Sequence, residues 1–523
     1  MFLLACALLA AVFLLILRYM RGGTGPCMIC VTRDRGCVDL GSKSRALGTS
    51  EKHQLALQRW VHPEDARWKQ REEGKQFKVI MLTYGTRGDV QPLIALALAL
   101  EELGLSTALC APACYQSYVE QFGIKYLYGG VDSFDQPQAA FESSNTKIAQ
   151  VLDLFAEDMP SVANAMLKAC EGYDFIVSAP LIRDIGKQIA EKYRIPAFGA
   201  YFAPSDTPTG AFPPYEYLSV QGSWFDHILP FLVPWRNKFL FHWRSVQIVR
   251  AAFSCGLVKF SETFRHDILK LPKIDLSTFL NDATQQPQLQ GYSKWVQPRP
   301  TDWGSNIMVT GYWRLGSRFM DSVLGLQRGN SGRDMSKQLD AFIRKAKKAK
   351  KHIVFITFGS MQNVDDLISM VTKASLELGF YVIIGDTRHV QSKSLISSSK
   401  VFVCKQVINH AIIFPLCACI VHHGGAGTTC SAFYAGLPSI VIPILVWADQ
   451  VYWGTRVTSV GCGSMISRSE CTHDLLKSTL LRTTTVTMLA NAKLMRKKLR
   501  DEPCGALVSA KIIRQYLDSL VIH

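Results

Sequence analysis

A glycine-rich turn flanked by histidines and threonines is the segment of this sequence best suited to chemistry. Residues 421–429 read Val-His-His-Gly-Gly-Ala-Gly-Thr-Thr and directly follow the apolar stretch 417–420. This order predicts a buried strand, a tight turn and a helix, whose first N–H groups and positive dipole end bind phosphate. Glycines let a diphosphate approach the backbone closely. The segment therefore predicts a site for a diphosphate leaving group such as UDP. A turn whose glycines serve only packing is the alternative.

Further blocks of sequence, in a fixed order along the chain, resemble the sterol 3-beta-glucosyltransferases. The resemblance covers roughly residues 77–520 and implies an inverting, nucleotide-sugar-dependent transferase. Its GT-B fold is α/β, with two Rossmann-like doubly wound domains that face each other across a cleft. The matching blocks are 85–92, the Pro/Thr-rich stretch 203–214, Tyr292-Ser293, Asp302-Trp303, 310–313, 357–361, 422–429, 435–438, Asp449-Gln450 and Trp453-Gly454.

The alternation of strand-like and helix-like segments independently predicts parallel, doubly wound sheets. One series of strands begins at Phe77–Thr83, and a second begins at His352–Thr357. Ligands of such sheets bind at the carboxyl ends of the strands, which favours a site between the two domains. We expect an N-terminal acceptor-binding domain over 76–313, a basic interdomain linker over 314–337 and a C-terminal nucleotide-sugar-binding domain over 338–505. The resemblance implies that residues 506–523 form a helix that crosses back to the first domain.

The first 17 residues are uninterrupted apolar residues, and positive residues follow them at Arg18 and Arg21. As a helix this run spans about 26 Å, the short end of a membrane crossing. Residues 1–21 therefore predict an N-terminal membrane anchor, and 22–75 a polar linker. A cleaved signal peptide would carry its charge before the apolar run. The positive-inside rule then places the catalytic part in the cytosol, which agrees with the lack of Asn-x-Ser/Thr acceptors in the chain.

The chain carries an excess of positive charge that calls for anionic partners. Its formal net charge is +16, and residues 314–352 contain eleven lysines or arginines against three acidic residues. This segment is either a solvated helix end or a surface that contacts an anionic membrane. No nucleic-acid recognition motif accompanies the charge, so we expect no nucleic-acid partner. The fifteen cysteines are an odd number and do not indicate a disulfide framework.

Transfer of a sugar to an alcohol needs a base for the hydroxyl proton and stabilisation of the departing diphosphate. The resemblance assigns the base to Asp89, between the first predicted strand and its helix. Asp89 can instead be only a helix cap, a role that aspartate fills well. Thr86 and Arg87 belong to the same motif and are assigned to the donor, with Arg87 holding a phosphate or orienting Asp89. A surface salt bridge is the alternative for Arg87.

The resemblance places the donor on the second domain. The diphosphate is expected on His423, whereas His422 is interpreted as a histidine packed in the core. Asp449 and Gln450 would bind the sugar hydroxyls, or else cap a helix, and Val407 would present its backbone to the uracil. No Asp-x-Asp metal motif occurs in the chain, so we expect no metal and no cofactor, with UDP-glucose as co-substrate. The backbone donors expected at the diphosphate are Ala426, Gly427, Thr428 and Thr429.

These observations predict a membrane-anchored glycosyltransferase that moves glucose from UDP-glucose to the 3-hydroxyl of a sterol or similar lipid alcohol. Residues 222–252, rich in Trp, Phe and Leu, are a candidate wall for the acceptor. A transferase for another apolar aglycone or UDP-sugar remains open, as does an inactive relative that binds nucleotide sugar or lipid. The partners expected are a UDP-sugar, a sterol or lipid acceptor and a membrane.

Overall fold

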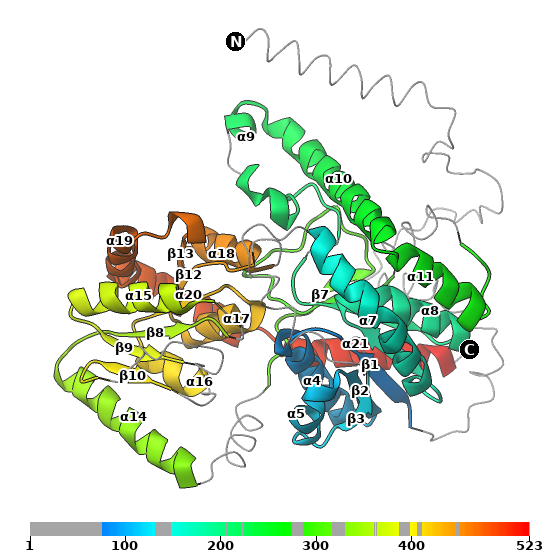
Figure 1. Cartoon of the computed structure of the whole chain (residues 1–523), viewed down its shortest axis with the longest axis horizontal. Coiled ribbons are helices and arrows are strands. Elements are labelled where there is room, and N and C mark those ends of the chain that lie inside the picture. The colour runs from blue at the N-terminus through cyan, green and yellow to red at the C-terminus, as the bar shows by residue number, and fades with distance from the viewer. Residues whose placement is uncertain are drawn as a thin grey trace, which may run out of the picture. The chain divides into compact units, whose positions relative to one another are not determined.

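A computed structural model describes two parallel β-sheets, each surrounded by helices (Figure 1). The first sheet and its helices are drawn in blue to green, and the second in yellow to orange. The residues that the structure describes are 76–130, 148–204, 207–220, 224–274, 286–315, 330–359, 361, 363–385, 398–404, 410–445 and 449–521.

Within the described residues the first sheet has seven strands in the order β3-β2-β1-β4-β5-β6-β7, and every neighbouring pair is parallel. The order reverses direction at β1, so a topological switch point lies between β1 and β4. The strands are β1 (Lys78–Leu82), β2 (Ser106–Ala111), β3 (Lys125–Tyr128), β4 (Phe175–Ser178), β5 (Ala197–Tyr201), β6 (Gln288–Gln290) and β7 (Ile307–Val309). The helices are α4 (Arg87–Glu102), α5 (Gln116–Glu120), α7 (Ile148–Ala169), α8 (Arg183–Tyr193), α9 (Trp224–Ile228), α10 (Val233–Ser254) and α11 (Leu257–Thr263).

The second sheet has six parallel strands in the order β10-β9-β8-β11-β12-β13 within the part of the chain that the structure describes. Its switch point lies between β8 and β11. The strands are β8 (Ile353–Thr357), β9 (Tyr381–Ile384), β10 (Val401–Val403), β11 (Cys419–His422), β12 (Ser439–Val441) and β13 (Gly463–Met465). The helices are α14 (Asn330–Lys348), α15 (Asp365–Glu377), α16 (His410–Ile413), α17 (Ala426–Ala435), α18 (Asp449–Ser459), α19 (His473–Thr483), α20 (Val486–Arg500) and α21 (Gly505–Val521).

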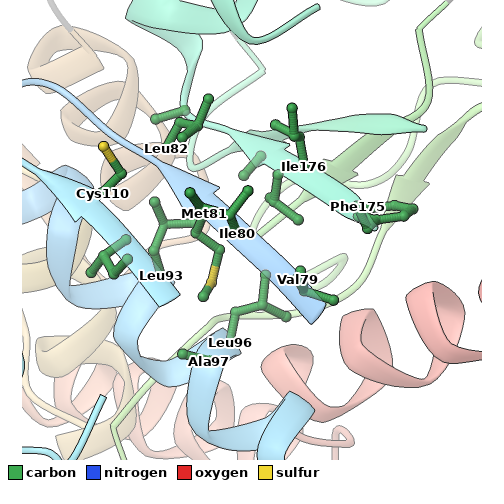
Figure 2. Packing of buried hydrophobic residues seen from close by; sticks show 14 of the residues in the cluster. Val79, Ile80, Met81, Leu82, Leu93, Leu96, Ala97, Cys110, Phe175 and Ile176 are labelled. Carbon is green, nitrogen blue, oxygen red and sulfur yellow. The ribbon is translucent and has the colours of Figure 1, made fainter. Parts of the chain in front are cut away.

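Burial on both faces explains why the central strands are continuous apolar runs. Four of the five residues of β1 are fully buried, as expected for a parallel strand covered by helices on both sides. Figure 2 shows Leu93, Leu96 and Ala97 of α4 packed against this strand. The core thus fixes the carboxyl end of β1, where the loop to α4 begins.

The last helix, α21, packs against α4 of the first sheet although it follows the second sheet in sequence. The ring of Tyr516 lies 5.9 Å from that of Phe175 on β4 and 5.2 Å from that of Phe198 on β5. At the start of α21, a Cβ added to Gly505 would lie 2.1 Å from the carbonyl oxygen of Gly311. The first sheet is therefore completed by the carboxyl-terminal end of the chain.

The α/β fold expected from the sequence is confirmed, with differences in detail. Strands β6, β7 and β13 were not predicted; β6 reads Gln-Leu-Gln and β13 reads Gly-Ser-Met, and neither is rich in the β-branched residues that indicate a strand. The predicted linker over 314–337 is partly helical, since α14 already begins at Asn330. The predicted anchor over 1–21 and linker over 22–75 lie outside the described residues. Among the residues that are described, no helix is long and apolar enough to cross a membrane.

Candidate functional site

The loop between β1 and α4 holds the candidate base. Thr86 caps α4, and its hydroxyl accepts a hydrogen bond of 3.1 Å from the N–H of Gly88. The backbone N–H of Thr86 donates to Oδ2 of Asp89 at 2.9 Å, and the Thr86 hydroxyl lies 3.2 Å from the same oxygen. Asp89 thereby closes a capping box, which fixes its carboxylate at the helix start. The cap considered as an alternative to the base is thus present in the structure.

Capping does not prevent Asp89 from serving as a base, because both hydrogen bonds from Thr86 go to one carboxylate oxygen, Oδ2. Burial raises the pKa of Asp89 from 3.8 to about 6, although the hydrogen bonds from Thr86 oppose the shift. A carboxylate with a pKa near the working pH is a more effective proton acceptor than an ordinary aspartate. Gly85 has a φ of +133°, and a Cβ on it would lie 2.6 Å from Oδ2 of Asp89, so the carboxylate needs a glycine there.

The side chain of Arg87 contacts Tyr118 and not Asp89. Its guanidinium lies 4.5 Å from the centre of the Tyr118 ring, and Nη2 donates to the Tyr118 hydroxyl at 3.2 Å. The Tyr118 hydroxyl donates in turn to Gln91 at 3.2 Å. A cation–π contact, and not the surface salt bridge considered above, therefore positions Arg87.

The turn between β11 and α17 forms the phosphate-binding candidate. His422, the last residue of β11, is fully buried, and its Nδ1 accepts a hydrogen bond of 3.1 Å from the N–H of Gly424. Burial, with the neighbouring His423 and His410, lowers the pKa of His422 well below 6.5. His422 is thus a neutral histidine of the core that shapes the turn, as the sequence indicated.

Helix α17 begins without a side-chain cap, at Gly425. The N–H of Thr429 already bonds to the carbonyl of Gly425 at 3.0 Å, and so does the Thr429 hydroxyl. The amides available for an anion are therefore those of Ala426, Gly427 and Thr428. Gly427 is exposed, and a Cβ on it would meet no atom within 4 Å. The predicted contribution of Thr429 fits this geometry poorly.

His423 lies beside this helix start, between two glycines. A Cβ on Gly425 would lie 2.5 Å from Nε2 of His423, and one on Gly359 would lie 3.1 Å from Cε1. Burial, followed by the neighbouring His410, lowers the pKa of His423 to about 4, so the imidazole is neutral at pH 7. Its Nδ1 has no hydrogen-bond partner among the described residues. A neutral imidazole with an unused nitrogen can bind a ligand oxygen.

Helix α18 presents Asp449 at its first position. The indole Nε1 of Trp453 donates to Oδ2 of Asp449 at 3.0 Å, a contact between residues one turn apart that the sequence analysis did not assign. Burial raises the pKa of Asp449 from 3.8 to about 7, the Trp453 hydrogen bond opposes this, and the charge of Asp89 raises it further. The charges of Asp89 and Asp449 therefore interact, although Asp89 follows strand β1 of the first sheet and Asp449 follows strand β12 of the second.

Gln450 has a different environment from its neighbour. Its side chain is buried, and its Oε1 accepts hydrogen bonds from the N–H groups of Ile444 at 2.8 Å and Leu445 at 2.9 Å. Its Nε2 lies 3.6 Å from the sulfur of Met361. Gln450 thus ties the loop after β12 to the start of α18, and the sugar contact expected of it stays a prediction.

The two sheets also meet through direct contacts of α18 with the first half. The Tyr452 hydroxyl donates to Oε1 of Gln297 at 2.6 Å, and Arg456 donates to the carbonyl of Val296 at 2.6 and 2.9 Å. Next to these contacts is a cavity of about 330 Å³. Neither Asp89, His423 nor Asp449 lines it. We therefore assign the cavity no part in the chemistry.

Two expectations cannot be followed into the structure. Val407 lies outside the described residues, so its contact with the uracil stays a prediction. No group of three or more His, Cys, Asp or Glu residues that could hold a metal occurs among the described residues. Such an absence does not test the metal-free reaction, which also stays a prediction.

Two protein-family models match the chain, one in each half. Residues 79–211 match the glycosyltransferase family 28 N-terminal domain, and residues 382–514 match the erythromycin biosynthesis protein CIII-like C-terminal domain. The sterol 3-beta-glucosyltransferase of Cryptococcus neoformans var. neoformans serotype D is 28% identical over 460 residues, 81% of this chain. That of Saccharomyces cerevisiae is 27% identical over 449 residues, 82% of this chain. The chain is thus a relative of the sterol 3-beta-glucosyltransferases.

The chain spans only about a quarter to a third of these relatives, 26% of the Cryptococcus protein and 34% of the Saccharomyces protein. The UDP-sugar-dependent glycosyltransferase 52 of Dictyostelium discoideum is 24% identical over 78% of this chain and 24% of its own length. The match is therefore to one part of larger proteins.

Comparison with solved structures shows which fold this chain has. The glycotransferase of kitacinnamycin superposes with a TM-score of 0.59 at 16% identity, over 85% of this chain and all of that one. The calicheamicin glycosyltransferase CalG4 gives a TM-score of 0.58 at 15% identity, over 85% of this chain and 99% of that one. The fold is therefore the GT-B fold of glycosyltransferases.

Proposed function

We propose that this chain transfers glucose from UDP-glucose to the 3-hydroxyl of a sterol or a similar lipid alcohol, with inversion at the anomeric carbon. The observation that carries the proposal is the geometry of two loops. Asp89, after β1, is fixed at the start of α4 by Thr86, and α17, after β11, begins without a side-chain cap beside His423. The first loop offers a base and the second an anion site. The names of the curated relatives support the sugar and the acceptor.

In this proposal Asp89 accepts the proton of the acceptor hydroxyl as its oxygen attacks the anomeric carbon. Thr86 holds the carboxylate in place, and Arg87, held by Tyr118, adds positive charge to the same loop. A fixed base within reach of the nucleophile lowers the barrier by general base catalysis. The bond between the anomeric carbon and the β-phosphate oxygen breaks as the new glycosidic bond forms, and its electron pair leaves with UDP.

The second sheet stabilises the leaving group. The N–H groups of Ala426, Gly427 and Thr428 and the ring of His423 bind the diphosphate oxygens, where negative charge develops. Asp449 binds a sugar hydroxyl, and Gln450 supports it by holding the preceding loop. The backbone of Val407 binds the uracil. We propose that these donors suffice without a metal ion.

The predicted anchor and orientation belong to the same proposal. Residues 1–21 attach the chain to a membrane, with the catalytic part on the cytosolic side. In sealed microsomes, added protease should digest the catalytic part without detergent. Protection until detergent is added would overturn the orientation.

The proposed reaction is tested by incubating the purified chain with a panel of UDP-sugars and a lipid extract, followed by mass spectrometry of the products. We expect a hexosylated sterol, or another hexosylated lipid alcohol, with UDP-glucose. A hexosylated product of another apolar class would redefine the acceptor. UDP-sugar binding without any product would indicate an inactive relative and overturn the proposal.

A further inference from the structure

A row of exposed aromatic side chains runs along α10 and the short helical turn η6 (Pro230–Leu232) before it. Phe231, Trp235, Phe239 and Trp243 are 69%, 74%, 53% and 46% exposed. Residues four apart lie on the same face of a helix, so these four form one continuous strip. We call them the aromatic stripe. Scattered exposed apolar residues are ordinary, but a contiguous set of large ones marks a contact surface.

The opposite face of α10 is firmly attached to the protein. Asn237 and Phe241 are buried, and the Asn237 amide donates to the carbonyl of Gly210 at 2.9 Å. The ring of Phe241 lies 6.4 Å from that of Phe212, and α10 also packs on α7 and α11. The helix is thus fixed by one face, and the aromatic stripe is a rigid feature of the other.

The composition around the stripe points to the kind of surface that it meets. Lys238 and His242 are exposed among the aromatic residues, and Lys238 also pairs with Asp302 at 3.2 Å. Helices α9 and α10 together contain four lysines or arginines and a single aspartate, Asp226. Tryptophan is favoured where hydrocarbon meets lipid headgroups, and basic residues are attracted to anionic headgroups. An in-plane helix with Trp and Phe on its outer face is typical of interfacial membrane binding.

We propose that the aromatic stripe inserts into an anionic lipid bilayer as far as the boundary between headgroups and acyl chains, independently of residues 1–21. The inference rests on the proposed function in one respect, since a bilayer is where a lipid acceptor would be found. The exposed face of α10, which lies within the predicted acceptor wall 222–252, would then bind the membrane that supplies the acceptor.

The test uses tryptophan fluorescence of the full chain on vesicles of phosphatidylcholine and phosphatidylserine whose acyl chains are brominated. Bromine quenches only the indoles that reach the acyl chains. The informative variant is Trp235→Phe with Trp243→Phe, which keeps the stripe apolar and removes its reporters. The matched control is Trp295→Phe, because Trp295 is also exposed but lies outside the stripe.

We expect the vesicles to quench the wild-type chain and the Trp295→Phe variant to a similar extent. In the double variant at least half of the quenching should disappear while the protein still sediments with the vesicles. Quenching that the double variant retains in full would overturn the proposal, because other tryptophans would then be the ones in contact with lipid.

A second measurement separates the membrane from a second copy of the chain. Without vesicles, analytical ultracentrifugation should show the same mass for wild type and for Trp235→Ser with Phe239→Ser. A wild-type dimer that this variant dissociates would assign the stripe to self-association and overturn the proposal. Quenching requires no turnover, so a quenched but inactive chain would support the stripe and contradict the proposed function alone.

Discussion

At the residue scale, Asp89 and Asp449 each have a pKa raised toward neutrality, which means that their surroundings disfavour the charged carboxylate. Burial is the main cause for both, and the charge of Asp89 adds to the shift at Asp449. Burial of this kind is a common way to raise the pKa of a catalytic carboxylate toward the working pH.

The pH dependence of the reaction should follow Asp89. Its pKa is about 6 and it must be ionised to accept a proton, so kcat/KM should fall as the pH drops below about 6. Asp449, whose pKa is about 7, is already mostly protonated at the pH where Asp89 loses its charge, so Asp449→Asn should leave this acid limb in place. Profiles of kcat/KM over roughly two pH units on either side of the pKa measure the limb. Asp501→Asn, at an exposed aspartate, is the control and should also leave the limb in place. A limb that moves to lower pH in Asp449→Asn but not in Asp501→Asn would mean that Asp449 is charged there and raises the pKa of Asp89.

His423→Ala should weaken UDP binding by about tenfold and slow transfer, because the developing charge on the diphosphate loses a donor worth about 1–2 kcal/mol. Isothermal titration with UDP measures the affinity, with EDTA present throughout. His473→Ala is the control, since His473 pairs with Glu377 on the surface. Activity that EDTA abolishes and magnesium restores would contradict the metal-free account.

At the element scale, the turn from β1 into α4 shows how a loop can fix a catalytic group. Gly85→Ala should abolish most activity, since a Cβ would lie 2.6 Å from Oδ2 of Asp89. Gly104→Ala, just after the other end of α4, is the matched control: Gly104 also has a positive φ of +79°, but nothing lies within 4 Å of its Cβ. Both variants should lose about 1–3 kcal/mol through backbone strain. Equal activity in the two would show that the position of Asp89 is unimportant. Turnover and thermal unfolding separate the effects.

The same elements show what the sequence could and could not predict. The glycine-rich turn before α17 and the motif around Asp89 are local, so their residues predict strand, turn and helix directly. The sequence predicted that Asp89 could cap a helix, but it did not predict the capping box with Thr86. It does not show which oxygen of the Asp89 carboxylate accepts the hydrogen bonds. The supports of Arg87 and Asp449 are contacts through space. Tyr118 lies far from Arg87 in sequence, and nothing local indicates their pairing.

The pattern of the sequence also did not predict three of the strands or the exposed face of α10. Strands β6 and β13 read Gln-Leu-Gln and Gly-Ser-Met, so their pairing with neighbouring strands, and not their own residues, makes them strands. Helix α10 was expected from its composition, but the sequence does not reveal that its aromatic residues divide between a buried face and an exposed stripe. Tertiary packing decides that division.

At the scale of the whole molecule, the first sheet depends on the last helix. Tyr516→Ala should cost about 3 to 5 kcal/mol of stability, because its ring packs on Phe175 and Phe198. Tyr516→Phe should change stability by less than about 1 kcal/mol, since the Tyr516 hydroxyl is buried without a partner among the described residues. Chemical denaturation measures both. Equal losses would show that the hydroxyl, and not the ring, stabilises the contact.

The central claim is that the two halves of this GT-B relative transfer glucose with inversion, using Asp89 as the base. The direct measurement is the rate and the anomeric configuration of the product formed from UDP-glucose and a sterol, by wild type and by Asp89→Asn. We expect a β-glucoside from wild type and a rate lower by about 100-fold or more from Asp89→Asn, with UDP affinity and thermal stability nearly unchanged. An α-glucoside, or near-normal turnover by Asp89→Asn, would contradict the central claim.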